Sequence, residues 1–218
     1  MFDDEQPRPP FSAEELRILG CLMEKQLTTP ASYPLTFNSL MNACNQKSSR
    51  EPTMNLTEGV VGHTAKVLVE GGWTAIQYSE RAQRVEHKVD RRLKLNRQQQ
   101  AVLCVLLLRR PQTLNEIKTR TERMADFANT DEIREILEAW MAAEKPLAVR
   151  LPAGAGRRED RYFHTLGTET LDELQTTEPA SPTASSHSST PRQDHYAQLE
   201  ARVAALEQRL AALESQLL

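Results

Sequence analysis

The sequence has few of the features that mark an enzyme, a secreted protein or a membrane protein. Its longest apolar run, Ala101 to Leu108, is far too short to cross a bilayer as a helix. The N-terminal residues MFDDEQPRPP are acidic and proline-rich, so we expect no secretion signal. The three cysteines, Cys21, Cys44 and Cys104, form no CxxC pair. Two of them lie in apolar helical stretches, where a free cysteine behaves as a small hydrophobe. We therefore expect a cytoplasmic protein with reduced, structural cysteines that does not associate with membranes.

Catalytic and metal-binding motifs are also scarce. The five histidines have no metal-ligand spacing to one another or to the cysteines. No glycine-rich phosphate loop, nucleophile elbow or paired-carboxylate motif is recognisable. Gly71-Gly72 is interpreted as the end of a helix. We expect a protein that is not an enzyme and that needs no metal or cofactor.

The net charge of −3 is unevenly distributed along the chain. Residues 1–95 carry 12 basic and 12 acidic side chains, residues 96–166 carry 12 and 10, and residues 167–218 carry 3 and 8. Neither of the first two regions has the strong basic excess typical of a nucleic-acid-binding domain. The charge composition therefore argues against a nucleic-acid-binding function but does not exclude it.

Two halves of the chain repeat one order of elements. Ser12–Glu15 has the pattern of a capping box that opens a helix, and Thr28–Pro30 ends that helix. Asn96 opens the corresponding helix of the second half, which Arg109–Pro111 ends. A short second helix follows in each half, because Thr36-Phe-Asn-Ser-Leu40 aligns with Thr113-Leu-Asn-Glu-Ile117. Thr113 and Glu116 form a further capping box.

A third helix and a β-hairpin complete each repeat. Thr57 and Thr130 have the position of N-caps, and acidic residues follow both of them in the first turn. The expected strand pairs are Trp73–Ile76 with Arg84–Val89 and Leu147–Val149 with Arg161–His164. Three helices and a hairpin, twice over, are the order of tandem winged-helix domains. The fold class is mainly α with small β-hairpins (α+β), with domains at 12–95 and 96–166.

The stretches LGCLMEK, TTPASYPLTFNSLMNACNQKSSREP and AVLCVLLLRRPQT closely resemble the YceH family of bacterial proteins. That family is described as tandem winged helices without an established biochemical activity. The resemblance covers residues 12–166 and leaves out the tail beyond residue 167. It implies the fold that the repeat predicts, and it supplies no catalytic residues.

The tail predicts a linker followed by a coiled coil. Residues 167–194 are rich in Thr, Ser, Pro and Glu and cannot bury enough apolar surface to order themselves, so we expect a disordered linker. Residues 195–218 carry apolar heptad positions, at Tyr196, Leu199, Val203, Leu206, Leu210, Leu213 and Leu217. Oppositely charged g and e positions, such as Arg202 and Glu207, favour a parallel homodimer. The alternative is a single amphipathic helix that folds back on the body.

Winged helices usually bind DNA with the third helix in the major groove and the wing on the backbone. Here the third helix of the second repeat exposes Asp131, Glu135 and Glu138, which suit base reading poorly. Basic side chains instead gather at the hairpins and in the loop 45–55. The candidate nucleic-acid contacts are Lys47, Arg50, Arg81, Arg84, Arg157, Arg158 and Arg161. These predict a DNA-associated, regulator-like protein that binds backbone with little sequence readout. The alternative is a protein-interaction scaffold that uses the winged helices and the 45–55 loop and does not bind nucleic acid.

Overall fold

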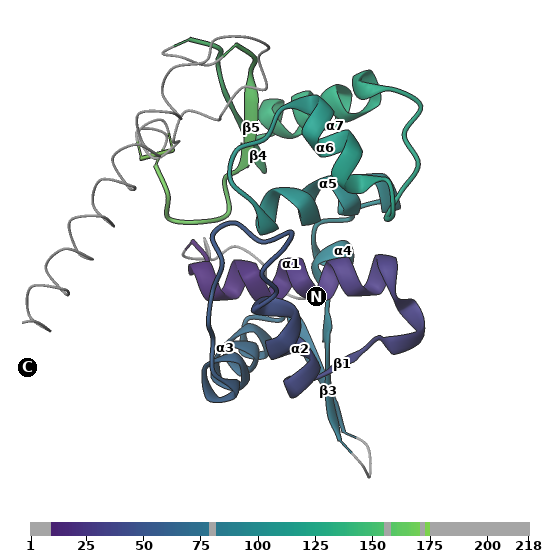
Figure 1. The fold of residues 1–218 in the computed structure, drawn as a ribbon, viewed down its shortest axis with the longest axis vertical. Helices are drawn as coiled ribbons and strands as arrows, with labels where there is room; N and C mark the ends of the chain where they lie inside the picture. The colour runs from purple at the N-terminus through teal and green to yellow at the C-terminus, as the bar shows by residue number, and fades with distance from the viewer. Residues whose placement is uncertain (1–9, 79–81, 155–157, 171–172, 175–218) are drawn as a thin grey trace, which may run out of the picture. The chain divides into compact units, whose positions relative to one another are not determined.

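The computed structural model describes residues 10–78, 82–154, 158–170 and 173–174 (Figure 1). The first half contains α1 (Ala13–Thr28), the 3-10 turn η1 (Pro30–Ser32), β1 (Leu35–Thr36), α2 (Phe37–Cys44), α3 (Glu58–Glu70), β2 (Thr74–Tyr78) and β3 (Gln83–His87). The short α4 (Val89–Arg92) leads to the second half, with α5 (Arg97–Leu108), α6 (Leu114–Thr121), α7 (Thr130–Ala142), β4 (Ala148–Leu151) and β5 (Arg161–His164). The described part of the chain is thus a mixed α/β structure with seven α-helices and two small antiparallel sheets.

Local capping explains where the helices begin. The two predicted capping boxes are confirmed: Ser12 and Glu15 bond reciprocally at α1, and Thr113 and Glu116 do so at α6. Asn96 caps α5 and forms a third box with Gln99. At α7 the predicted cap is wrong, because Asn129 rather than Thr130 accepts the first free N–H groups of the helix. Asparagine is a stronger N-cap than threonine, which explains the one-residue shift.

Both predicted hairpins are present: β5 has the predicted ends, and the ends of β2, β3 and β4 differ from the prediction by one or two residues. β2 and β3 pair antiparallel, and β1 adds to the other edge of β3, so that Val85 lies opposite both Leu35 and Ile76. β4 and β5 form the second hairpin. An isolated bridge between Gln112 and Tyr162 occupies the place in the second half that β1 occupies in the first. The two halves therefore share strand topology as well as helix order.

The first helices of the two halves, α1 and α5, pack directly against each other (Figure 1). Gly20 lies at their contact, where an added Cβ would be only 2.8 Å from Cδ2 of Leu108 and 3.2 Å from Cβ of Leu107. The Cys104 thiol donates to the Gly20 carbonyl at 3.3 Å. Because of this close packing, most buried apolar residues of both halves form one continuous core, and Leu151, Phe163 and Leu174 form a small separate cluster.

The tail predictions fall largely outside the described residues. Of the predicted linker, the structure describes 167–170 and 173–174, and all of the predicted coiled coil, 195–218, lies outside. Among the helices that the structure describes, none is both long and apolar enough to span a membrane.

Candidate nucleic-acid interface

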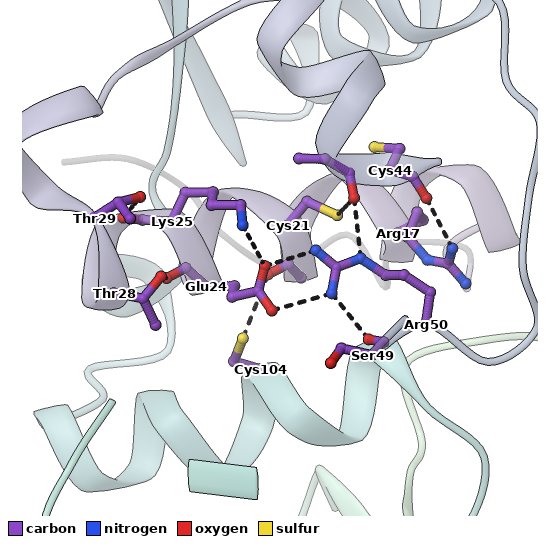
Figure 2. Close-up of polar contacts among 12 residues, drawn as sticks. Arg17, Cys21, Glu24, Lys25, Thr28, Thr29, Cys44, Ser49, Arg50 and Cys104 are labelled. Carbon is purple, nitrogen blue, oxygen red and sulfur yellow. Dashed lines mark hydrogen bonds and ion pairs between the residues drawn. The ribbon is translucent and has the colours of Figure 1, made fainter. Parts of the chain in front are cut away.

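Arg50, one of the predicted nucleic-acid contacts, is 2% exposed. Its guanidinium donates to both carboxylate oxygens of Glu24 on α1, at 2.6 Å to Oε2 and 3.0 Å to Oε1 (Figure 2). It also donates to the carbonyls of Ala43 and Ser49, at 3.0 and 2.9 Å. The prediction that Arg50 contacts nucleic acid is therefore wrong, because a buried and fully bonded guanidinium does not reach a phosphate. Its position ties the loop between α2 and α3 to α1.

Two further charges complete this buried cluster. Lys25 lies 3.2 Å from the same carboxylate of Glu24. Burial acts to raise the pKa of Glu24, but the hydrogen bonds and positive charges of Arg50 and Lys25 outweigh it and hold that pKa below its usual range. Arg17 donates to the carbonyl of Cys44 at 3.0 Å (Figure 2) and to that of Pro52 at 2.5 Å, and so anchors the start and the middle of the loop. Arg17 and Arg50 thus hold the α2–α3 loop against α1.

The cysteines are confirmed as buried free thiols. Cys21 donates to the Ala43 carbonyl at 3.3 Å, next to the bond from Arg50 to the same carbonyl. Burial raises the pKa of Cys104 well above its usual value. A buried protonated thiol is unreactive, which fits the structural role predicted for Cys104.

The predicted hairpin arginines differ in whether their side chains are free to contact nucleic acid. Arg84 and Arg158 are exposed, although Arg84 also donates to the Pro34 carbonyl at 2.8 Å. Arg161 is engaged internally: it donates to Oε2 of Glu116 at 2.9 Å and to the Pro111 carbonyl at 2.8 Å. Arg81 and Arg157 lie outside the described residues. Of the predicted wing contacts, the structure therefore describes two with an exposed side chain.

Lys47, the remaining predicted contact, is exposed and lines a pocket of about 550 Å³ between the two halves of the chain. We call this the basic pocket. Its charged lining residues are Glu24, Lys25, Lys47, Arg109, Arg120 and Arg123. Hydroxyl groups from Thr28, Thr29, Ser48 and Ser49 complete much of its wall. Five cations and one carboxylate make this a strongly positive site, and the carboxylate is already bound by Arg50 and Lys25.

Arg109 at this pocket is unusual. It is 8% exposed, and its Nη1 is buried without a hydrogen-bond partner in the described part of the chain. Burial and then the nearby positive charge of Arg120 lower the pKa of Arg109. Arg120 itself is held by Gln112 at 2.6 Å. Two neighbouring guanidiniums, one of them buried and unsatisfied, favour a bound anion.

Sequence reasoning missed Arg109, Arg120 and Arg123. From the sequence, Arg109 is interpreted as part of a helix end, and no role is assigned to Arg120 or Arg123. The available signal was the set of basic residues around the end of α6, at Lys118, Arg120 and Arg123. Its meaning depends on α1 packing against α5, which brings this region to the α2–α3 loop, and no local pattern predicts that contact.

The outer faces of the third helices carry little positive charge. On α3 the exposed large apolar side chains are Val60 and Val67, at 42% and 38% exposure. On α7, Asp131, Glu135 and Glu138 are exposed, and Arg134 pairs with Asp131 at 2.5 Å. Neither face offers a row of donors for base edges.

The buried histidines do not form a site with one another. His87 donates through Nε2 to Gln26 and accepts from the Val89 N–H through Nδ1, and burial lowers its pKa to about 4. Burial lowers the pKa of His164 to about 3. Both rings are therefore neutral near pH 7. Among the described residues, no cluster of histidine, cysteine or carboxylate side chains has the arrangement of a metal site.

Comparison with known proteins identifies the relatives of this chain. A family model described as "Protein of unknown function, DUF480" matches residues 11–157. A UPF0502 protein of Pseudomonas fluorescens (strain SBW25) is 45% identical over 202 residues, which are 93% of this chain and 92% of that protein. A UPF0502 protein of Pseudomonas putida (strain F1) is 51% identical over 157 residues, 72% of each chain. A UPF0502 protein of Azotobacter vinelandii is 50% identical over 168 residues, 77% of this chain and 74% of the relative.

These matches cover the body of the chain, where the repeats and the basic pocket lie. The resemblance to YceH proteins found in the sequence is consistent with them. The chain therefore belongs to the DUF480 family, whose bacterial relatives are named UPF0502 proteins.

Proposed function

We propose that this protein binds nucleic acid through its backbone, with the basic pocket as the main phosphate-binding surface. The observation that carries the proposal is the convergence of Lys47 from the first repeat with Arg120 and Arg123 from the second on one pocket. Phosphate oxygens are the ligands that clustered Arg and Lys side chains prefer in nucleic acids. The hydroxyl groups of Ser48 and Ser49 are further donors for phosphate, whereas those of Thr28 and Thr29 already donate to the carbonyls of Glu24 and Lys25.

The tandem winged-helix interpretation supports this function. In the first half, the order α1-β1-α2-α3-β2-β3 with β1 and β2 on either side of β3 is that of a winged helix. The second half repeats it, with the Gln112–Tyr162 bridge in place of a first strand. Winged helices are a common DNA-binding architecture. The wings would add Arg84 and Arg158 as backbone contacts.

Binding of this kind has little sequence specificity. The outer faces of α3 and α7 hold valines and carboxylates instead of a set of base-reading donors. Carboxylates repel phosphates, so α7 is not expected to enter a groove. The protein is then a DNA-associated, non-enzymatic factor that recognises charge and shape more than bases.

Self-association would strengthen such binding. We propose that residues 195–218 dimerise as a parallel coiled coil. Two weak backbone-binding bodies joined in this way engage one duplex with a higher effective concentration than either alone.

A second candidate function is protein docking by the outer face of α3. Val60 and Val67 are exposed there, about two turns apart, and α3 also carries Gly59 and Gly62. Exposed apolar side chains on a helix suit a partner protein better than a phosphate backbone. A chain that does not bind nucleic acid would favour this second function.

Titration of a labelled random-sequence duplex at low salt tests the proposal. Binding is expected for the unmodified chain, with a large loss in the variant Arg120→Gln/Arg123→Gln. The matched control is Arg91→Gln/Lys145→Gln, which removes two exposed charges away from the basic pocket and should bind as the unmodified chain does. Undetectable binding at low salt would refute the proposal.

The wings and the third helix provide two more arms of that titration. Arg157→Glu/Arg158→Glu is expected to weaken binding to every sequence to a similar extent, because it removes backbone contacts. Substitution of Glu135 and Glu138 by glutamine is expected to have little effect. A strong dependence on the α7 residues would instead indicate base reading by that helix.

A further inference from the structure

A second pocket, of about 260 Å³, lies beside the N-terminus of α1. We call it the α1 pocket. Its apolar wall includes Phe11, Leu16, Leu107 and Phe163. Pockets that hold small molecules usually range from about 300 to 1,000 Å³ and are mostly apolar with a few polar groups. The α1 pocket is slightly smaller than that range, which limits its ligand to a compact molecule.

Two buried arginines line this pocket without a carboxylate partner. Arg17 is 2% exposed and donates only to backbone carbonyls, and its Nε has no hydrogen-bond partner in the described residues. Arg109 is 8% exposed and lines both the α1 pocket and the basic pocket. No described carboxylate forms an ion pair with either guanidinium. A buried charge of this kind is costly unless an ion of opposite sign compensates it.

His164 adds a third unsatisfied group. It is 4% exposed, lines the α1 pocket, and has a buried Nδ1 without a hydrogen-bond partner among the described residues. Gly167, also in the wall, leaves the ring uncovered, since a Cβ there would lie 3.4 Å from Cε1 of His164. The neutral imidazole can donate one hydrogen bond without adding charge. Three polar side chains, each more than nine-tenths buried, thus meet at one small cavity with unused hydrogen-bonding capacity.

We infer that the α1 pocket binds a small organic monocarboxylate. The carboxylate would accept from the buried guanidinium and imidazole groups, and the apolar body would lie against Phe11, Leu16 and Phe163. Guanidinium groups bind carboxylates with strong, charge-assisted hydrogen bonds. A single negative charge suits this wall better than a phosphate dianion, because most of the wall is carbon and desolvating a second charge is unfavourable.

Two carboxylates of the protein also border the pocket. Glu169 is bound by Arg110 at 2.6 Å, so its charge is compensated. Glu51 is exposed to solvent, where water screens its charge. Neither pairs with Arg17 or Arg109, and the positive charge inside the pocket is left for a ligand.

Calorimetry and thermal unfolding of the full chain test this inference with butanoate, isovalerate, benzoate and phenylacetate. At least one of these is expected to bind saturably and raise the melting temperature. The neutral isostere benzamide and inorganic phosphate are the control ligands and should not. Failure of all four carboxylates, or equal binding of benzamide, would overturn the inference. Tighter binding of phenyl phosphate than of benzoate would overturn the assignment to carboxylates.

The variant Ala13→Glu places a negative charge at the pocket wall, on the exposed first residue of α1. A carboxylate in the first turn of a helix is favourable, so the variant should fold. It is expected to weaken carboxylate binding about tenfold by repulsion, whereas the control Ala13→Gln should not. Equal binding by Ala13→Glu and Ala13→Gln would contradict the site.

This inference and nucleic-acid binding can fail independently. Ala13 does not line the basic pocket, so Ala13→Glu should bind duplex DNA as the unmodified chain does. Arg109→Met removes a group common to both pockets and should abolish carboxylate binding while reducing DNA binding. Carboxylate binding that survives in Arg109→Met would refute the role assigned to that guanidinium.

Discussion

Arg50 and Glu24 form a bidentate ion pair, 2.6 and 3.0 Å long, in which the Arg50 side chain has no exposed surface. The pair links the α2–α3 loop, which also carries Lys47, to α1. A residue that resembles a surface cation in the sequence is thus part of the interior. The same buried contact positions the loop that lines the basic pocket.

Removing one partner of this pair should be costly. Glu24→Ala leaves the Arg50 guanidinium buried without its carboxylate, and a loss of about 3–5 kcal/mol in unfolding free energy is expected. The double variant Glu24→Leu/Arg50→Met removes both charges and should recover most of that loss. Urea unfolding of the three chains measures this. A loss below about 1 kcal/mol in Glu24→Ala would mean that water reaches Arg50.

Substitution of Gly20 tests the contact between α1 and α5. Helix propensity alone predicts that alanine stabilises a helix relative to glycine by about 1 kcal/mol. Here the added Cβ meets Leu108 at 2.8 Å, so Gly20→Ala should instead destabilise by roughly 1–3 kcal/mol. The control is Gly62→Ala in α3, where no atom lies within 4 Å and the usual gain is expected. Stabilisation by both substitutions would refute the close packing.

The two buried histidines should make stability fall in mild acid. Their pKa values, about 4 for His87 and about 3 for His164, lie below the value of 6.5 in an unfolded chain. The unfolded state therefore binds more protons as the pH falls below 6.5, and stability drops by about 1.4 kcal/mol per pH unit for each histidine until about pH 4. Unfolding at about pH 7.5 and pH 5 measures the effect.

Single substitutions test whether the two buried histidines cause that pH dependence of stability. His87→Gln and His164→Gln should each reduce the difference in unfolding free energy between the two pH values by roughly 2 kcal/mol. The exposed His63 is the control, and His63→Gln should leave the difference unchanged. An unchanged difference in both buried variants would show that carboxylates cause it.

Removal of the tail tests self-association. Sedimentation should find a dimer for the full chain and a monomer after deletion of residues 190–218, because the apolar heptad positions are then lost. A full-length chain that sediments as a monomer would refute the coiled coil.

Much of the fold follows from local sequence. Capping boxes at Ser12–Glu15 and Thr113–Glu116 depend on residues three positions apart, and the repeat fixes the element order twice. The cap of α7 is predicted at Thr130 and lies one residue earlier, at Asn129, so this error also concerns only neighbouring residues. These helix starts can be predicted from local sequence because the free N–H groups at the start of a helix are bonded by side chains only a few residues away.

The candidate site was less predictable. Burial of Arg50 depends on Glu24, 26 residues earlier in the chain, and the basic pocket depends on the packing of α1 against α5. A list of basic residues does not separate an interior ion pair from a surface contact. Lys47 is exposed, and its contact with nucleic acid stays a prediction, whereas Arg109 acquires its importance only from the fold.

The salt dependence of duplex binding tests the central claim most directly. Each phosphate neutralised by a cation contributes about 0.9 to the slope of log affinity against log salt. The account predicts strong salt dependence for the unmodified chain. For Arg120→Gln/Arg123→Gln it predicts a slope smaller by about 2, while Arg91→Gln/Lys145→Gln leaves the slope unchanged. A slope that does not change in the Arg120→Gln/Arg123→Gln variant, or a flat response in the unmodified chain, would contradict it.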